Sequence, residues 1–496
     1  MRSPGLKGSV RQTPAFSPFD LWVADPKIQS LFLLLLAGLM FFMKLGEGGL
    51  ANYDHCFYAQ KAKEILQSGS WLTMHHAGNP AFENPPMYMW LVALAYKCFG
   101  VNEYAAQFPS ALLAVGAVGL TARLARDQFG SWAGLYAGFV LVTTTVFAKY
   151  ARRGMVDITL TFFGLVAFMA FRKALQRNPK YFLLFGAASG AGILTKSVLG
   201  FFPPLIAVLF LLFTRRFKVL FSGWFLAGMG MALALGGVWY WHETMRFGSA
   251  FLSAHFGWLI FQRGFQDNPE SWWKHLSYLR DLAIFYWPWL PVAAYGGYRL
   301  ARQAPKDSGA FLFLLWPLVI ISVMSVMRTR VFWYVLPAFP FLAIWAGVAL
   351  DRWVSPAKRI PTAKIVMGFS MVLLVCLQIF PIRFSMEREQ DVRAMAPYVK
   401  ALAGSKEVRV LAYRQAYYGL NNALLFYSDH AADPIFQKPE ELAAAWKADS
   451  LVLCVTDASE LPALRKEIPN LHLVKTTSRR CLFANRPLDV SSVGSP

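Results

Sequence analysis

The chain has 496 residues, of which 56% are hydrophobic and only 16% are charged. Average soluble domains are about 45–50% apolar and about 25% charged, so this composition excludes an ordinary soluble protein of several domains. The formal net charge of +21 would suit a nucleic-acid partner, but no zinc-finger or RNA-binding motif is present. The Lys and Arg residues instead form short clusters between apolar runs, which is typical of the cytosolic loops of membrane proteins.

Apolar stretches long enough to cross a membrane recur along most of the chain. Residues 1–27 are polar and basic, without the apolar core of a cleavable signal peptide, and predict a cytosolic tail. Since a spanning helix needs about 20 mostly apolar residues, we predict about eleven spans. They lie at 28–45, 105–124, 131–148, 158–171, 181–194, 199–213, 219–241, 282–298, 311–326, 333–350 and 365–382. The segment 87–99 is a twelfth span or an interfacial helix.

The basic residues predict the orientation of these spans. If the N-terminus is cytosolic, every inside loop contains several Lys or Arg residues, as the positive-inside rule requires. They are Arg123 and Arg126; Arg172, Lys173, Arg177 and Lys180; Arg215, Arg216 and Lys218; Arg299, Arg302 and Lys306; and Arg352, Lys358, Arg359 and Lys364. The segments 46–104 and 241–281 then become long outside loops, and an odd number of spans places the C-terminus outside.

The last part of the chain, 386–496, predicts a small extracytoplasmic α/β domain. Strand patterns at 408–412, 424–427, 451–455 and 471–474 alternate with helical patterns at 392–402, 439–447 and 460–466. Cys454 and Cys481 both fall here, and outside the cytosol a disulfide is open to them, although two buried free thiols are favoured. The predicted fold is therefore an all-α polytopic membrane protein, with its multi-spanning catalytic domain at 28–385, followed by this α/β domain.

Two stretches of the first outside loop contain candidate catalytic acids. In Tyr53-Asp54-His55-Cys56-Phe57-Tyr58-Ala59, helical spacing places Asp54 and Tyr58 on one face, one turn apart. Asp54 taken alone is equally a solvated loop acid. In the stretch 82–91 (FENPPMYMWL), the Pro-Pro pair begins a helix and fixes where Glu83 points.

Basic residues on the predicted outside run against the positive-inside rule and call for an anion. They occur in the stretch 149–157 (KYARRGMVD), at Lys196 between two apolar runs, and at Arg328 and Arg330. Ionisable residues at membrane depth are functional candidates. The alternatives are snorkelling for Lys196 and interfacial anchoring for Arg328 and Arg330. Together these cations could hold the phosphate of a lipid carrier.

Taken in order, these motifs resemble the GT-C superfamily of lipid-dependent glycosyltransferases. The similar branch contains the protein O-mannosyltransferases and the aminoarabinose transferases that modify lipid A. The matching blocks are Asp54 with Tyr58-Ala59, then 83–91, 152–157 with its Arg-x-Gly-Met-x-Asp pattern, 194–197 (LTKS) and 334–337 (YVLP). The resemblance covers residues 28 to about 385, and the fixed order of the blocks makes it specific.

The resemblance implies a sugar donor linked to polyprenyl phosphate, an acceptor outside the cytosol and inversion at the anomeric carbon. The acceptor would be lipid A, a cell-envelope glycan or a protein, and the enzyme would lie in a bacterial inner membrane with its active site facing the periplasm. No nucleotide cofactor is implied, and a divalent metal ion is open.

The resemblance also implies roles for single residues. Asp54 would be the principal catalytic carboxylate, Asp157 a second acid, and Glu83 would orient the acceptor or bind a metal together with His255. The donor phosphate would be bound by a set of basic and tyrosine side chains: Lys196, Arg152, Arg153, Arg263, Arg328, Arg330, Tyr334 and Tyr58.

Two other functions fit a chain with many spans. One is a secondary transporter or flippase of a lipid-linked envelope precursor, and the other is an inactive subunit that scaffolds envelope enzymes. Transporters usually have broken helices with charges near the membrane midplane. Here the charges cluster at one predicted face, which favours the transferase.

Overall fold

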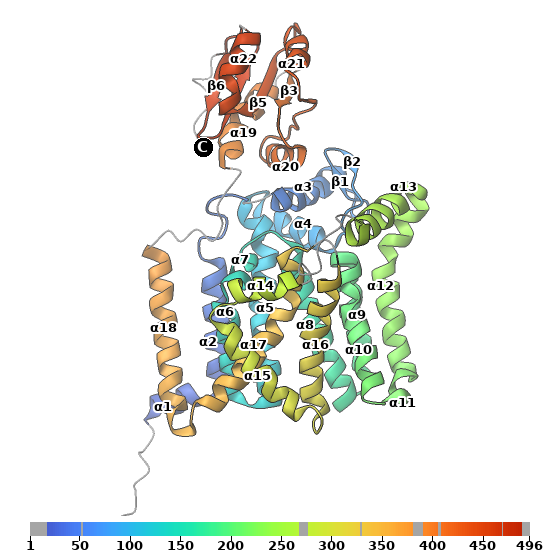
Figure 1. Ribbon diagram of the computed structural model, residues 1–496, viewed down its shortest axis with the longest axis vertical. Coiled ribbons are helices and arrows are strands. Elements are labelled where there is room, and N and C mark those ends of the chain that lie inside the picture. Colours follow the sequence, from blue (N-terminus) through green and yellow to red (C-terminus); the bar gives the residue numbers. More distant parts are fainter. Residues whose placement is uncertain are drawn as a thin grey trace, which may run out of the picture.

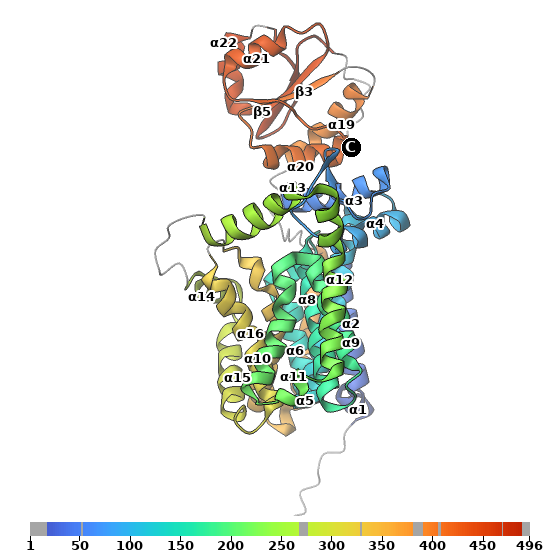
Figure 2. The same ribbon diagram turned by 90° about the vertical axis from the view of Figure 1, so that its right-hand side faces the viewer.

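The structure is a bundle of long apolar helices with a smaller α/β domain at one end (Figure 1). It is a computed structural model that describes residues 17–50, 53–266, 276–327, 330–379, 390–404, 408–468 and 470–488. Both views show the bundle helices running roughly parallel to the long axis of the molecule (Figures 1 and 2).

Seven helical runs among the described residues are long and apolar enough to span a membrane, or nine if two bent pairs count as single spans. The seven are α5 (Glu103–Phe129), α8 (Val156–Gln176), the run Tyr181–Phe213, α12 (Gly223–Phe247), α16 (Ser308–Val326), the run Phe332–Trp353 that ends with α17 (Phe339–Trp353), and Pro356–Cys376, which contains most of α18 (Arg359–Ile379). The bent pairs are α1 (Pro18–Ala24) with α2 (Pro26–Phe42), and α6 (Ser131–Thr143) with α7 (Thr145–Ala151).

The polytopic helical fold is confirmed, whereas the count of eleven spans is not. The predicted span 282–298 is divided between α14 (Ser277–Phe285) and α15 (Trp289–Gln303). Pro288 directly precedes α15, and proline removes a backbone donor and interrupts a helix. The segment 87–99 forms a short apolar helix, α4 (Met87–Phe99).

The run Tyr181–Phe213 turns back on itself after Lys196. It consists of α9 (Tyr181–Lys196), a 3₁₀ turn at Ser197–Phe201 and α10 (Phe202–Phe213). A Cβ added at Gly200 would overlap with the backbone of Gly192 and Ile193. In a straight helix, residues eight positions apart lie about 12 Å apart along the axis. The chain is therefore reversed here, as the separate predicted spans 181–194 and 199–213 require, and Lys196 lies at the turn.

This turn makes Gly200 sensitive to substitution. We expect Gly200→Ala to lower the free energy of unfolding by about 3 kcal/mol, because the added methyl group meets rigid backbone that has no room to move. Gly230→Ala in α12 is the matched control, since a Cβ at Gly230 has no atom within 4 Å. Thermal unfolding of both variants in detergent measures the difference, and equal melting temperatures would contradict the tight turn.

Helices α9 and α12 cross closely through small residues. A Cβ at Gly186 would overlap with the carbonyl group of Gly228. A Cβ at Gly190 would lie 2.8 Å from the Leu235 Cβ and 3.1 Å from the Ala232 carbonyl oxygen. Small residues four apart let helix backbones approach in this way within a membrane. The crossing fixes the position of α9, and therefore of Lys196 at its end.

The C-terminal domain is a mixed sheet between two helical layers. The strand order is β4 (Ile435–Phe436), β3 (Arg409–Tyr413), β5 (Val452–Asp457), β7 (Arg480–Ala484) and β6 (His472–Thr476). β3 runs parallel to β4 and β5, whereas β7 is antiparallel to both β5 and β6. α19 (Gln390–Ala403) and α20 (Tyr417–Ser428) share the core on one face, while α21 (Pro439–Trp446) and α22 (Leu461–Glu467) cover the other.

This domain confirms the predicted α/β pattern with one correction. The predicted strand 424–427 is wrong, because it lies within α20. Leu420, Ala423 and Leu424 are all buried, and their spacing is that of one helix face rather than of a strand. Cys454 and Cys481 are buried free thiols, which is the alternative that the sequence favoured over a disulfide.

The α/β domain packs directly on α3 (Tyr53–Ser68), the helix that begins with the Asp54 motif. The Tyr427 hydroxyl accepts a hydrogen bond from the backbone N–H of Leu50 at 2.9 Å. Lys63 of α3 forms an ion pair with Asp429. The loops predicted to be cytosolic lie at the other end of the bundle, near α1 and α11 (Phe217–Leu220) (Figures 1 and 2).

Candidate active site

A buried ion pair joins Asp157 and Lys196 at the end of the bundle nearest the α/β domain. Asp157 lies in the first turn of α8, where the helix dipole favours a negative charge, and its side chain is 1% exposed. Its Oδ2 atom is buried and accepts no hydrogen bond from any described residue. The Lys196 Nζ also lies 4.1 Å from the ring centroid of Tyr334. Three of the predicted site residues thus form one unit.

Tyr150 connects this unit to Asp54. Asp54 is half-buried in the first turn of α3, and the carboxylates of Asp54 and Asp157 both interact electrostatically with the Tyr150 hydroxyl. The guanidinium of Arg153 lies 5.7 Å from the Tyr150 ring centroid. Residues from α3, α7, α8 and α9 therefore meet at one end of the bundle. Tyr150 was not predicted as a site residue, although it lies within the basic stretch 149–157.

The His255 side chain lies between Phe82, in the first predicted outside loop, and Ser197, in the turn that follows Lys196. Its Nδ1 lies 2.6 Å from the Phe82 carbonyl oxygen, and its Nε2 lies 3.0 Å from the Ser197 Oγ. Tyr240 donates a hydrogen bond to the same Oγ at 2.9 Å. Burial lowers the pKa of His255, so the neutral ring donates through Nδ1 and accepts at Nε2. Both ring nitrogens are thus used within the protein.

Glu83 forms an ion pair with Lys61, a residue that was not predicted. The Lys61 Nζ lies 2.8 Å from the Glu83 carboxylate and 4.0 Å from the Phe57 ring centroid, and its side chain is fully buried. Burial lowers the pKa of Lys61, and the charge of Glu83 opposes that shift. Asp54, Tyr58 and Lys61 follow each other at helical spacing on one face of α3, so this spacing could have identified Lys61.

The two predicted metal ligands, Glu83 and His255, both have protein partners in this arrangement. The nitrogens of His255 already have protein partners, and Glu83 already faces a cation. Within the described ranges, no group of three or more His, Cys, Asp or Glu residues could hold a metal ion. A metal ion bound by Glu83 and His255 stays a prediction, and the steps derived below assign roles to protein side chains alone.

Removing Glu83 and removing Lys61 should lower the free energy of unfolding by different amounts. Glu83 is one-third exposed and can be hydrated, whereas Lys61 is fully buried. Glu83→Gln leaves a buried cation unpaired and is expected to lower the free energy of unfolding by about 3 kcal/mol. Lys61→Met leaves only a partly hydrated carboxylate and should cost clearly less. Thermal unfolding of both variants measures this order, and a larger loss in Lys61→Met would contradict it.

Other predicted phosphate-binding residues are placed differently. Arg152 donates to the carbonyl oxygens of Met40 at 2.9 Å, Met43 at 2.6 Å and Lys44 at 3.1 Å, so its guanidinium caps the end of α2 instead. α7 ends at Ala151 with Arg152 as its C-cap, and the guanidinium of the next residue, Arg153, lies near the Tyr150 ring. Of the two arginines, only Arg153 stays with the site.

Tyr58 and the later arginines complete the predicted set. Tyr58 is buried, with its ring centroid 5.9 Å from that of Tyr88 in α4. The Nε of Arg330 donates to the Met327 carbonyl at 2.9 Å, and both Arg330 and Tyr334 interact electrostatically with Tyr278. Arg328 and the side chain of Arg263 lie outside the described residues.

Comparison with known proteins identifies relatives of this chain. Residues 83–241 match the family described as dolichyl-phosphate-mannose-protein mannosyltransferase. The undecaprenyl phosphate-alpha-4-amino-4-deoxy-L-arabinose arabinosyl transferase of Pseudomonas paraeruginosa is 30% identical over 395 residues, 73% of this chain and 67% of that protein. A relative of the same name from Pseudomonas fluorescens is 30% identical over 360 residues, which cover 66% of this chain and 60% of the relative.

Solved structures show the same fold. ArnT from Cupriavidus metallidurans bound to undecaprenyl phosphate superposes with a TM-score of 0.74 at 20% identity, over 94% of this chain and 99% of that one. An oligosaccharyltransferase from Archaeoglobus fulgidus superposes with a TM-score of 0.57 at 13% identity, over 93% of this chain and 74% of that one. From these relatives and the fold, the chain belongs to the GT-C superfamily of membrane glycosyltransferases, in the branch of the aminoarabinose transferases and protein O-mannosyltransferases.

Proposed function

We propose that this chain transfers a sugar from a polyprenyl-phosphate donor to an acceptor on the periplasmic face of a bacterial inner membrane. The observation that carries this proposal is that Asp54 and the Asp157–Lys196 pair both lie near Tyr150, in the part of the bundle that shares a core with the α/β domain. The opposite end carries the basic loops that the positive-inside rule assigns to the cytosol. The names of the relatives, which include undecaprenyl phosphate and an arabinosyl transfer, support the same donor class.

The leaving group sets the main electrostatic demand of this reaction. When the acceptor oxygen attacks the anomeric carbon, the bond from that carbon to the phosphate oxygen breaks and negative charge develops on the lipid phosphate. Lys196 is a preorganised cation in a largely buried position, where such a charge interacts more strongly than in water. Asp157 holds the ammonium group in place, and Tyr334 covers it.

The acceptor has to lose a proton as it attacks. Asp54 lies near the same site but on α3, on the side of the bundle that the α/β domain covers. As general base it would take the proton from the acceptor hydroxyl, while the phosphate leaves towards Lys196. Attack from the side opposite the leaving phosphate gives inversion at the anomeric carbon.

The acceptor we propose is lipid A or another glycan of the cell envelope. The relatives named as arabinosyl transferases align with more of this chain than the family match at residues 83–241 does. The family match, described as a protein mannosyltransferase, supports a protein acceptor as the second candidate. A transporter or flippase receives no support from these relatives.

The test is an assay with the purified full chain in lipid nanodiscs. Undecaprenyl phosphate linked to aminoarabinose, or to a hexose, is supplied together with lipid A, and both released undecaprenyl phosphate and the glycosylated product are measured by mass spectrometry. We expect both products to form in equal amounts with at least one donor, and only in the presence of an acceptor. Failure of every donor with lipid A, with envelope glycan and with protein acceptors would overturn the proposal.

A further inference from the structure

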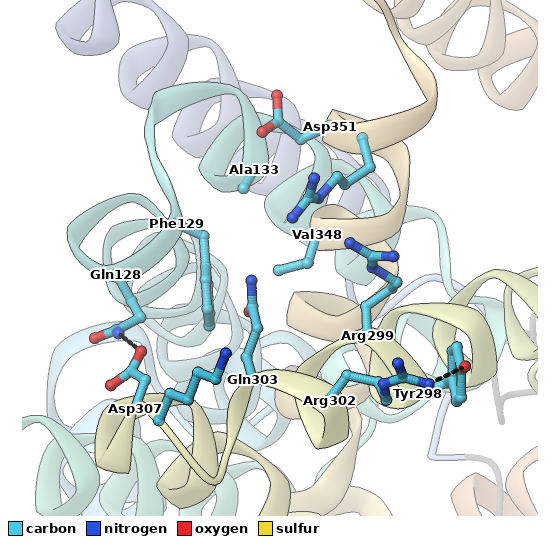
Figure 3. A pocket seen from close by; sticks show the side chains of 12 residues that line it. Gln128, Phe129, Ala133, Tyr298, Arg299, Arg302, Gln303, Asp307, Val348 and Asp351 are labelled. Carbon is cyan, nitrogen blue, oxygen red and sulfur yellow. Dashed lines mark hydrogen bonds between the residues drawn. The ribbon is translucent and has the colours of Figure 1, made fainter.

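A cavity lies among the helix ends at the opposite end of the bundle from the α/β domain (Figure 3). Its volume is about 750 Å³, and it lies between the ends of α5, α15 and α17, the start of α6 and the residues that directly precede α16. This volume lies in the range of about 300–1,000 Å³ that small-molecule sites usually have.

The cavity is lined by more positive than negative side chains. The cations are Arg299, Arg302, Lys306 and Arg352, and the acids are Asp307 and Asp351. Figure 3 shows Arg299 and Arg302 entering from the same helix, α15. An excess of positive charge around a partly enclosed space raises the local concentration of anions.

The two acids balance only part of the charge of the four cations, and both also have partners outside that set. Asp307 accepts hydrogen bonds from the Gln128 side chain at 3.0 Å and from the backbone N–H of Gly309 at 2.7 Å. Asp351 forms an ion pair with Arg359 at 2.8 Å. The Nε of Arg299 is buried, and in the described part of the chain nothing accepts its hydrogen bond.

The position of the cavity indicates what kind of anion it would meet. It opens where apolar helices end, on the side of the bundle that carries the basic loops. Beside it, the exposed rings of Tyr295 and Trp353 stack with centroids 5.2 Å apart, and Tyr298 is also exposed. Exposed Trp and Tyr rings at helix ends are typical of the level of lipid headgroups. Basic pockets between helices at that level bind anionic lipid headgroups.

We propose that this cavity binds the phosphate group of an anionic phospholipid from the leaflet opposite the active site. Arg299 and Arg352 would contact the phosphate oxygens, and the aromatic pair would pack beside the acyl chains. The site is separate from the donor site, so it holds whether or not the proposed sugar transfer is correct.

Native mass spectrometry of the full chain, freed of lipid in a neutral detergent, tests this proposal. Dioleoyl phosphatidylglycerol is titrated against dioleoyl phosphatidylcholine, and we expect clear preference for the anionic lipid. The double variant Arg299→Gln/Arg352→Gln should weaken phosphatidylglycerol binding by about 30-fold, since each basic residue near the headgroup contributes a factor of about five. The matched control is Arg177→Gln/Lys180→Gln, two exposed basic residues of another predicted inside loop that do not line the cavity.

Three outcomes would overturn the proposal. Equal binding of both lipids would show that the headgroup is not recognised. An equal loss in the control variant would assign the preference to general surface charge. Displacement of phosphatidylglycerol by millimolar inorganic phosphate would identify a site for a soluble anion rather than for a membrane lipid.

Discussion

Lys196→Met is expected to lower the rate of sugar transfer by about 10²–10³-fold, the loss typical when one preorganised group that meets developing charge is removed. The same substitution should also destabilise the protein. Asp157 is 1% exposed, and without Lys196 its charge is buried and unpaired. Breaking a buried pair from one side costs about 3–5 kcal/mol. A low rate in this variant alone would therefore not separate chemistry from folding.

The double variant Lys196→Met/Asp157→Asn separates the two effects. It removes both charges together and keeps side chains of similar size, so most of the lost stability should return. The transfer rate should stay low, because no cation is left to meet the phosphate. Thermal unfolding and the release of undecaprenyl phosphate are measured on the same preparations. If the double variant regained both stability and rate, the pair would be structural only.

The residues of this pair could be predicted from the sequence, but their pairing could not. Lys196 stood out because a single cation between two apolar runs is costly without a role. Asp157 stood out because an acid begins an apolar helix next to a basic stretch. They lie 39 positions apart, and their contact depends on how α8 packs against α9, which no spacing within the sequence specifies.

Adjacent arginines show where sequence reasoning fails. Arg152 and Arg153 have the same charge and the same neighbours, so the sequence left both as phosphate ligands. The end of α7 separates them, because Arg152 reaches back to the carbonyl groups at the end of α2 while Arg153 lies near Tyr150. Carbonyl groups at a helix end attract cations wherever the chain brings them close.

Lys61 was not predicted as a site residue, because its burial also depends on how the helices pack. Lys61 looks like an ordinary polar residue of an amphipathic helix, and it is buried because α3 packs against the segment that contains Glu83. The strand predicted at 424–427 failed because a short apolar run carries no periodicity of its own. Its neighbours Leu420 and Ala423 supply the helical period once the run is extended.

Asp54→Asn is expected to lower the rate of sugar transfer by about 10³-fold while leaving stability nearly unchanged. Loss of a general base typically costs about 10²–10⁴-fold. Asp54 is half-buried in the first turn of α3, where the helix dipole favours its charge by about 0.3–1 kcal/mol, and asparagine keeps the size of the side chain. The rate is measured as product formed per unit of folded protein, with the fold checked by thermal unfolding.

Glu103→Gln is the matched control for this variant. Glu103 also lies in the first turn of a helix, α5, and at the same end of the bundle, but it pairs with Arg393 of the α/β domain at 3.0 Å. Its loss removes a similar dipole term and should leave the transfer rate within about twofold of the unmodified chain. An equal fall in both variants would mean that the rate depends on the general negative charge at this end rather than on Asp54.

A small external base then separates proton transfer from the other roles of a carboxylate. Asp54→Ala opens space where the side chain was, and formate can enter that space and accept the acceptor's proton. If Asp54 acts as general base, formate should raise the rate of Asp54→Ala but not that of Lys196→Met, because the second variant lacks the cation and not the base. If formate leaves the rate of Asp54→Ala unchanged while the fold is intact, Asp54 positions the acceptor or stabilises positive charge on the sugar, and the base lies elsewhere.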